Sequence, residues 1–335
     1  MKEKSFFCLK AVAAGAVAFV VLNILCIFYF NVPIHEPSKT KSTDYIWQPD
    51  KFYSRGTEGF AKGVTDKKGF NNLKTFEEDE IDVLVMGSSH MEAFNVAQNK
   101  NAVALLNDTS KELGLNFNFY NIGISGHTLE KCLYNLENAV CEFAPKEYVV
   151  IETQSVKPGV GSLKAALEGK LNPIESHNEG IIGKLQKFPY LRLVYTQMKN
   201  AKESELAEET KQIKRESNDT EERCVLLDEL IQRSAKICDE NGVKLIIFYN
   251  CTVEIDENGN VLERKELEDV RAFSEICENN NVIFIDMYED FKDDYIKTHK
   301  LSRGFSNSEA GKGHINEDGH RIISKRLFDV ISKSN

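Results

Sequence analysis

Five short runs rich in Val, Ile, Phe and Tyr recur in the chain, at 81–87, 117–125, 147–153, 243–250 and 282–288. Such runs are typical of β-strands. Helical patterns separate them and continue to the C-terminus, at about 96–114, 128–143, 221–241, 263–280 and 317–333. Strands that alternate with helices form right-handed βαβ units. We therefore predict an α/β domain with a three-layer, doubly wound, mostly parallel five-stranded sheet.

One connection in this pattern is much longer than a single crossover helix requires. About 90 residues separate the third and fourth predicted strands, and we treat 156–222 as an insertion. Within it, residues 188–198 read FPYLRLVYTQM, which indicates either a lid or platform over the site or simple core packing. Residues 201–222 are almost wholly polar and are typical of a solvated helix or a mobile loop.

An uncharged stretch of 22 residues, 11–32, lies near the N-terminus, and Asn23 and Asn31 are its strongly polar side chains. A helix needs about 20 apolar residues to cross the hydrocarbon core of a bilayer. The stretch shows no polar stripe of the kind that a surface helix carries. We therefore predict a single-pass transmembrane anchor over 1–32. The alternative is a cleaved signal peptide, whose apolar region is usually about 7–15 residues long.

The charge around this stretch gives its expected orientation. Residues 1–35 contain three lysines and one glutamate, a sum of +2, whereas the whole chain carries −10. Lysines before the span favour a cytoplasmic N-terminus and an extracytoplasmic main domain, although Lys39 and Lys41 follow the span and oppose that assignment. The acidic total excludes a nucleic-acid binder that depends on phosphate contacts. We expect a linker and irregular entry segment at 33–79 and the main domain at 80–335.

Eight cysteines are scattered through the chain without a CxxC pair, so no zinc site is indicated. Leu25 is too bulky for the small-residue pattern that usually precedes a lipid-modified cysteine, which argues against lipidation of Cys26. Five of the cysteines fall in helical patterns, and we expect them to be small buried thiols: Cys132, Cys141, Cys224, Cys238 and Cys277. No metal or cofactor is expected.

Polar residues follow the first three predicted strands. Gly87-Ser88-Ser89-His90 follows the first strand and leads into a helix, where backbone N–H groups can stabilise an oxyanion. A plain helix N-cap is the alternative role for a serine there. The second strand ends in 121–128, NIGISGHT, and the third in Glu152-Thr153-Gln154-Ser155. Because ligands bind beyond the carboxyl ends of parallel strands, these residues are the candidate site.

The last helix is preceded by residues 313–320, which read GHINEDGH. Asn316 suits the N-cap of that helix, and the acids after it suit its first turn. That local role does not explain His314, because a histidine in such a loop can reach across the site as a general base. A structural or incidental histidine is the alternative.

Together these segments resemble the SGNH (GDSL-like) hydrolase family over residues 80–155 and 282–333. Gly87-Ser88-Ser89 resembles the first block of the family, with Ser89 in the nucleophile position. Residues 121–126 resemble the second block, and His314 with its neighbours resembles the last. The resemblance implies Ser89 as nucleophile, His314 as base, and the Gly126 N–H and the Gln154 amide as oxyanion donors.

The family's triad acid is missing from its usual place, because position 311, three residues before His314, is Gly. Glu309 or Asp286 can substitute for it, or a Ser–His dyad can act with a backbone carbonyl. His90 and His127 lie beside the motifs; each either lines the site or sits at a helix start facing solvent.

The resemblance implies a membrane-tethered serine esterase or O-acyltransferase acting on acylated cell-surface glycan or polymer. In the transferase case a membrane protein that donates the acyl group is the implied partner. The alternative is a non-catalytic relative that binds glycan or helps to assemble a surface complex. The gap at position 311 favours that alternative. So does Glu152-Thr153-Gln154-Ser155, the stretch equivalent to the family's third block, which is usually Gly-x-Asn-Asp. The presence of Ser89 and His314 favours the enzyme.

Overall fold

A computed structural model describes residues 2–77, 80–115, 117–172, 185, 187–198 and 220–333. Its central feature is a five-stranded sheet of order β10-β9-β8-β6-β7, in which each neighbouring pair is parallel. The strands are β6 (Val83–Met86), β7 (Phe119–Asn121), β8 (Tyr148–Thr153), β9 (Lys244–Tyr249) and β10 (Ile283–Asp286). All five lie within the predicted runs, so the predicted sheet is confirmed.

Helices cover both faces of this sheet, as the parallel strands require. Contacts between helices join one layer made of α4 (Leu129–Phe143), α5 (Val160–Leu167), α8 (Thr220–Glu240) and α9 (Leu267–Asn279). Contacts join a second layer made of α3 (Ala102–Glu112), α10 (Tyr288–Thr298) and α11 (Glu317–Lys333). The predicted three-layer α/β class is therefore confirmed, and α5 and α10 are helices that the pattern did not predict.

In chain order the five strands have the spatial order 2-1-3-4-5, which is the flavodoxin-like arrangement. The direction of winding reverses between β6 and β8. Such a switch point opens a crevice at the carboxyl ends of the strands, and this is where ligands bind in open α/β sheets. The short helix α2 (Ser89–Glu92) begins at this point, directly after β6.

Residues 30–76, which cover most of the expected linker and entry segment, contain five short strands. They form the antiparallel sheet β1 (Phe30–Asn31), β4 (Phe52–Arg55) and β5 (Ala61–Val64), and the hairpin β2 (His35–Pro37) with β3 (Tyr45–Trp47). Six aromatic residues of the segment join the main core: Phe30, Tyr45, Trp47, Tyr53, Phe70 and Phe76. Strands of two to four residues are too short to show a period in the sequence, and Pro and Gly obscured them further.

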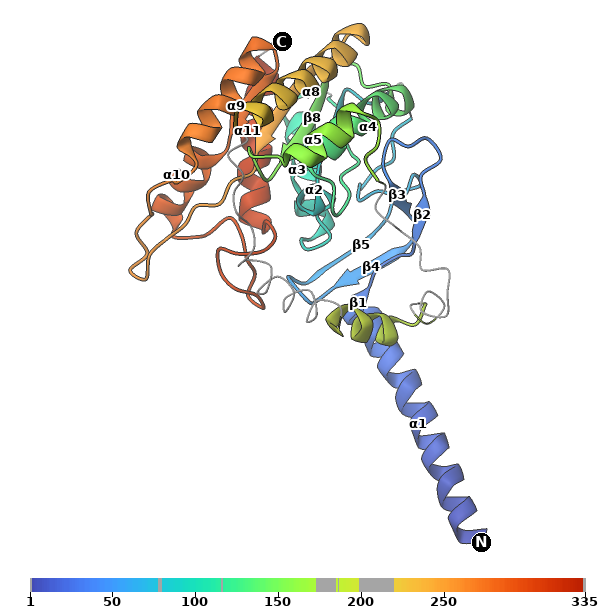
Figure 1. The fold of residues 1–335 in the computed structure, drawn as a ribbon. Helices are drawn as coiled ribbons and strands as arrows, with labels where there is room; N and C mark the ends of the chain where they lie inside the picture. Colours follow the sequence, from blue (N-terminus) through green and yellow to red (C-terminus); the bar gives the residue numbers. More distant parts are fainter. Residues whose placement is uncertain are drawn as a thin grey trace.

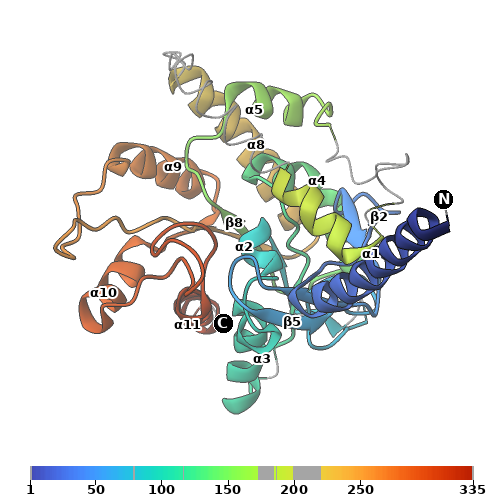
Figure 2. The ribbon, with the colours of Figure 1, turned by 90° about the horizontal axis from the view of Figure 1, so that it is seen from below.

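The N-terminal helix α1 (Lys2–Tyr29) projects from the domain (Figure 1). Its segment Phe6–Tyr29 has the length and the composition to cross a membrane. Only 6% of an 18-residue apolar stretch within it is buried. Residues 189–198 form a helix that lies beside α1 (Figure 2). This aromatic part of the insertion therefore packs on the candidate membrane span, and its Leu193 also contacts the core. The polar run is described from residue 220 onward, where it begins α8; the rest of it lies outside the described residues.

Candidate active site

The two serines after β6 have different partners. Ser88 is the N-cap of α2, because its side chain accepts a hydrogen bond from the His90 backbone N–H at 3.2 Å. Ser89 is half-buried, and its Oγ lies 3.0 Å from Nε2 of His314. The capping role that the sequence left open therefore belongs to Ser88, and the Ser89 hydroxyl faces a base.

His314 is held on both sides of its ring. Nδ1 lies 2.6 Å from Oε2 of Glu58, and the His314 backbone N–H donates to Oε1 of the same carboxylate at 2.8 Å. An ionised carboxylate only accepts hydrogen bonds, so Nδ1 carries the proton and Nε2 has a free lone pair for the Ser89 hydroxyl. The chain Ser89–His314–Glu58 thus has the geometry of a catalytic triad.

Glu58 comes from the loop between β4 and β5, in the segment expected to be a linker. Burial raises the pKa of this carboxyl, but hydrogen bonds from the His314 side chain and backbone outweigh burial, and the net pKa lies below its ordinary value. Asn307 fixes the loop by accepting from the Gly59 N–H at 2.8 Å and donating to the Gly56 carbonyl at 2.7 Å. The side chain is therefore placed and charged as a triad acid must be.

The acid candidates suggested by the sequence have other partners. Asp286, at the end of β10, forms a two-point ion pair with Arg264. Glu309 pairs with Lys312 at 2.6 Å on the surface. Neither contacts His314, so the expectation that Glu309 or Asp286 lies beside that histidine is corrected: the carboxylate there is Glu58. The Ser89–His314 pair therefore has a carboxylate partner, unlike the expected dyad with a backbone carbonyl.

The candidate oxyanion donors lie at the ends of the neighbouring strands. Gly126 has a φ of 86°, and the adjacent Ser125 donates to Glu92 at the end of α2, which holds this loop against the helix that begins at Ser89. Gln154, after β8, donates from Nε2 to Ser88 Oγ at 2.6 Å. In this structure the Gln154 amide therefore supports the capping serine next to Ser89.

A buried polar network supports the His314 loop from beneath. Arg303 donates to the Gly313 carbonyl at 3.0 Å, on one side of His314. On the other side, the Ile315 N–H donates to Nδ1 of His90 at 3.1 Å. Arg303 also donates to the backbone and side-chain oxygens of Asn250, both at 2.8 Å. The peptide groups that flank His314 are thus fixed by two side chains from other elements.

His90 and His127 are both buried, so neither has the solvent-facing role that was one expectation. Burial, followed by the nearby charge of Arg303, holds the pKa of His90 well below its ordinary value, so the ring is neutral and Nδ1 can accept. His127 faces Asp44 at 3.7 Å, and burial lowers its pKa to about 4. His90 therefore supports the active-site loop, whereas the partner described for His127 lies outside the triad.

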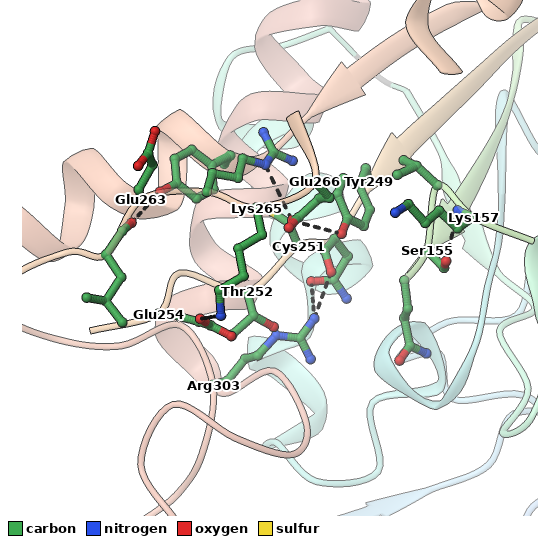
Figure 3. A pocket seen from close by; sticks show the side chains of 16 residues that line it. Ser155, Lys157, Tyr249, Cys251, Thr252, Glu254, Glu263, Lys265, Glu266 and Arg303 are labelled. Atoms are coloured by element: carbon green, nitrogen blue, oxygen red, sulfur yellow. Dashed lines mark hydrogen bonds and ion pairs between the residues drawn. The ribbon is translucent and has the colours of Figure 1, made fainter. Parts of the chain in front are cut away.

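A cavity of about 350 Å³ adjoins the site at the carboxyl ends of β8 and β9 (Figure 3). Its lining includes Gln154, Asn250 and Arg303 of the network described above, together with Tyr249 and Tyr288. Arg303 is 8% exposed and, among the described atoms, its Nε has no hydrogen-bond partner. Ser89, His314 and Glu58 are not among its lining residues, so the cavity meets the candidate site through Gln154, Asn250 and Arg303.

The expectation of small buried thiols holds for Cys132, Cys238 and Cys277, whereas Cys141 is exposed and Cys224 is intermediate. All eight cysteines are free thiols. Among the described residues, no cluster of three His, Cys, Asp or Glu side chains has the geometry to hold a metal ion.

No family model matches the chain, and no curated protein matches its sequence. Among solved structures, a two-domain esterase active on acetylated mannans is similar at 11% identity and a TM-score of 0.42, over 76% of this chain and 51% of that one. The chain thus spans about half the length of that esterase.

Two further structures are covered almost completely. An acetyl xylan esterase is 14% identical, with a TM-score of 0.41, over 74% of this chain and 98% of that one. A lipolytic protein of the G-D-S-L family from Veillonella parvula is 14% identical, with a TM-score of 0.41, over 75% of this chain and 98% of that one. These are likenesses of fold, and the chemistry of the present chain is argued from Ser89, His314 and Glu58.

Proposed function

We propose that the chain is a serine esterase or O-acyltransferase that acts through an acyl-enzyme on Ser89. The observation that carries the proposal is the continuous hydrogen-bonded chain from Ser89 Oγ through His314 to Glu58. A serine next to a neutral imidazole that is itself oriented by a carboxylate is the arrangement that activates a hydroxyl for acyl transfer.

In the first half-reaction, Ser89 Oγ attacks the carbonyl carbon of an ester while His314 Nε2 takes the hydroxyl proton. The tetrahedral intermediate carries a negative oxygen. The proposed donors to it are the N–H groups of Ser89 and Gly126, with the second N–H of the Gln154 amide, whose first bonds to Ser88. One such donor typically stabilises the transition state by about 3 kcal/mol. Collapse breaks the ester C–O bond, and His314 returns the proton to the leaving alcohol.

In the second half-reaction, water or a sugar hydroxyl attacks the acyl-enzyme, with His314 again acting as base. Ser89 is then released with its proton restored. Attack by water makes the protein an esterase, and attack by another hydroxyl makes it an O-acyltransferase. Glu58 stays ionised throughout and stabilises the imidazolium that forms at each step.

The proposed substrate is an acyl ester of a cell-surface glycan or polymer. The support for this class is α1, whose segment Phe6–Tyr29 has the properties of a membrane span, together with the basic N-terminal tip that favours an extracytoplasmic domain. In the transferase case, the acyl donor would be a second membrane protein next to this anchor.

A serine-directed fluorophosphonate probe tests the proposal in the full chain. Labelling of the wild type that disappears in Ser89→Ala is the expected result. Absence of labelling in folded wild-type protein would instead support the second function class, a non-catalytic glycan-binding or assembly protein. Release of acetate from an acetylated polysaccharide, compared with its transfer to an added sugar, then separates esterase from transferase.

A further inference from the structure

The end of α1 is built into the loop that carries Glu58. Strand β1 begins at Phe30, immediately after α1, and pairs with Arg55 of β4. Ser54 donates to the Ile27 carbonyl in the last turn of α1 at 2.7 Å. The ring of Tyr29 packs so closely on Gly56 that an added Cβ there would lie 2.6 Å from it. The catalytic acid is therefore two residues from the contact with the candidate span.

A second helix lies along α1 at the same end of the domain (Figure 2). The ring of Phe19 in α1 lies 5.6 Å from that of Phe188 and 6.4 Å from that of Tyr190. Asn23, a polar residue inside the apolar stretch, accepts a hydrogen bond from the Tyr190 N–H at 3.3 Å. Arg192 donates to the Val32 carbonyl just after the span. These contacts fix helix 189–198 beside the C-terminal half of α1.

Large apolar side chains are exposed around this junction. We call them, together with Lys51, Lys62 and Lys187, the membrane-exit face. The exposed fractions are 72% for Phe60, 69% for Met198, 61% for Phe28, 45% for Phe188 and 38% for Val194. Phe60 contacts Tyr29, with ring centroids 6.5 Å apart. Soluble proteins rarely expose large contiguous apolar patches, and this one continues the surface of a helix with the properties of a membrane span.

Basic side chains accompany the apolar ones. The Lys62 ammonium lies 5.9 Å above the ring of Phe28. Lys51, Lys187 and Arg192 line a hollow of about 200 Å³ directly after the span, and the described residues around it include no acid. In a chain with a net charge of −10, this local excess of cations suits anionic lipid headgroups.

We propose that the membrane-exit face lies in the headgroup region of a bilayer that contains anionic phospholipid. Helix 189–198 lies in the membrane interface, with Val194 and Met198, which share one helix face, toward the acyl chains. Lys51, Lys62 and Lys187 face the phosphates. The inference rests on the membrane tether of the proposed function and not on its chemistry. It places Glu58 next to the bilayer, so the acyl ester must reach the triad at the membrane surface.

Nitroxide-lipid quenching of tryptophan fluorescence in nanodiscs tests this with the full chain. Tryptophan replaces Val194 or Met198, and the native Trp47 is buried and common to every sample. Val225→Trp is the matched control, because Val225 is 62% exposed on α8, at the end of the domain away from α1 in Figure 1. A phosphatidylcholine labelled near the headgroup should quench Val194→Trp at least about twofold more than Val225→Trp, since interfacial helices bury their apolar face ~5–10 Å deep.

A labelled phosphatidylglycerol at the same mole fraction should quench Val194→Trp more strongly than the labelled phosphatidylcholine. That preference should disappear in a Lys51→Gln/Lys187→Gln background. Equal quenching by the two lipids in the wild-type background would overturn the anionic-headgroup part of the proposal.

Val17→Trp, in the middle of α1, reports on the tether separately through a lipid labelled deep in the chain. Quenching at Val17 without quenching at Val194 and Met198 overturns the interfacial placement and leaves the tether standing; a dimer in the same nanodiscs would then identify a second copy as the occupant. Absence of quenching at Val17 overturns the tether itself.

Discussion

Glu58 accepts two hydrogen bonds from His314, one from the ring Nδ1 at 2.6 Å and one from the backbone N–H at 2.8 Å. One carboxylate therefore fixes both the orientation of the imidazole and the position of its backbone. The two residues are 256 positions apart, and Glu58 lies in the loop between β4 and β5, which precedes the strands of the main sheet. The site exists only when the N-terminal segment is docked on the α/β domain.

Replacing Glu58 with Gln should lower kcat on an aryl acetate by about 10³- to 10⁴-fold, because an amide of the same shape can donate to Nδ1 and favour the wrong tautomer. KM should change little, since no ligand contact is assigned to Glu58. Steady-state kinetics of the full chain in detergent provides the measurement. Glu309→Gln is the matched control and should retain wild-type kcat. A strong loss of kcat in Glu309→Gln with none in Glu58→Gln would instead assign the acid role to Glu309.

Gly313→Ala should inactivate the enzyme through Glu58. A Cβ at position 313 would lie 2.2 Å from Glu58 Oε1, and the residue has a φ of 76°, which disfavours any side chain. The carboxylate must move away, so we expect kcat to fall as far as in Glu58→Gln. Gly311→Ala separates the two effects, because its φ is 78° but its nearest contact is the flexible end of Leu301 at 3.1 Å. Equal losses in both variants would show that loop strain, and not the carboxylate, is responsible.

The sequence predicted the sheet for a physical reason, because buried parallel strands have to be continuously apolar. Ser89 and His314 were candidates through the resemblance of their segments to a known family, and each lies beside an element with clear periodicity. Glu58 carries no such signal, since it lies between strands of four residues in a segment with several Pro and Gly. The glycines at 311 and 313 were the only indication in the sequence of an acid from another segment. Gly311 stands where the loop would carry its own acid, and Gly313 leaves space for the Glu58 carboxylate.

Ser88 and Ser89 should respond in opposite ways to replacement by Ala. Ser88 caps α2 and accepts from Gln154, so its loss should lower the free energy of unfolding by about 1 kcal/mol, while labelling by a fluorophosphonate persists. Ser89→Ala should abolish labelling and change stability by less than about 0.5 kcal/mol. Urea unfolding and probe labelling of the same samples test both. Loss of labelling in Ser88→Ala with retention in Ser89→Ala would make Ser88 the nucleophile and contradict the assignment of Ser89.

Acid should destabilise the fold through His320. Its Nδ1 accepts from the Ala102 N–H at 3.2 Å and so joins α11 to α3, and burial, followed by the charge of His314, lowers its pKa to about 3. The unfolded chain binds a proton at this position below about pH 6.5, while the folded chain stays neutral to about pH 3. Stability must therefore fall as pH falls through this window, by about 1.4 kcal/mol per pH unit for one such histidine.

Urea unfolding of the full chain in detergent at pH 6.5, 5.5 and 4.5 measures this slope. His320→Asn keeps an acceptor for the Ala102 N–H and removes the titrating group, so its stability should depend less steeply on pH than that of the wild type. His299→Asn is the matched control, because His299 is exposed and should leave the slope unchanged. The same slope in all three proteins would mean that His320 titrates alike in the folded and unfolded chains, and the acid sensitivity would then belong to other groups.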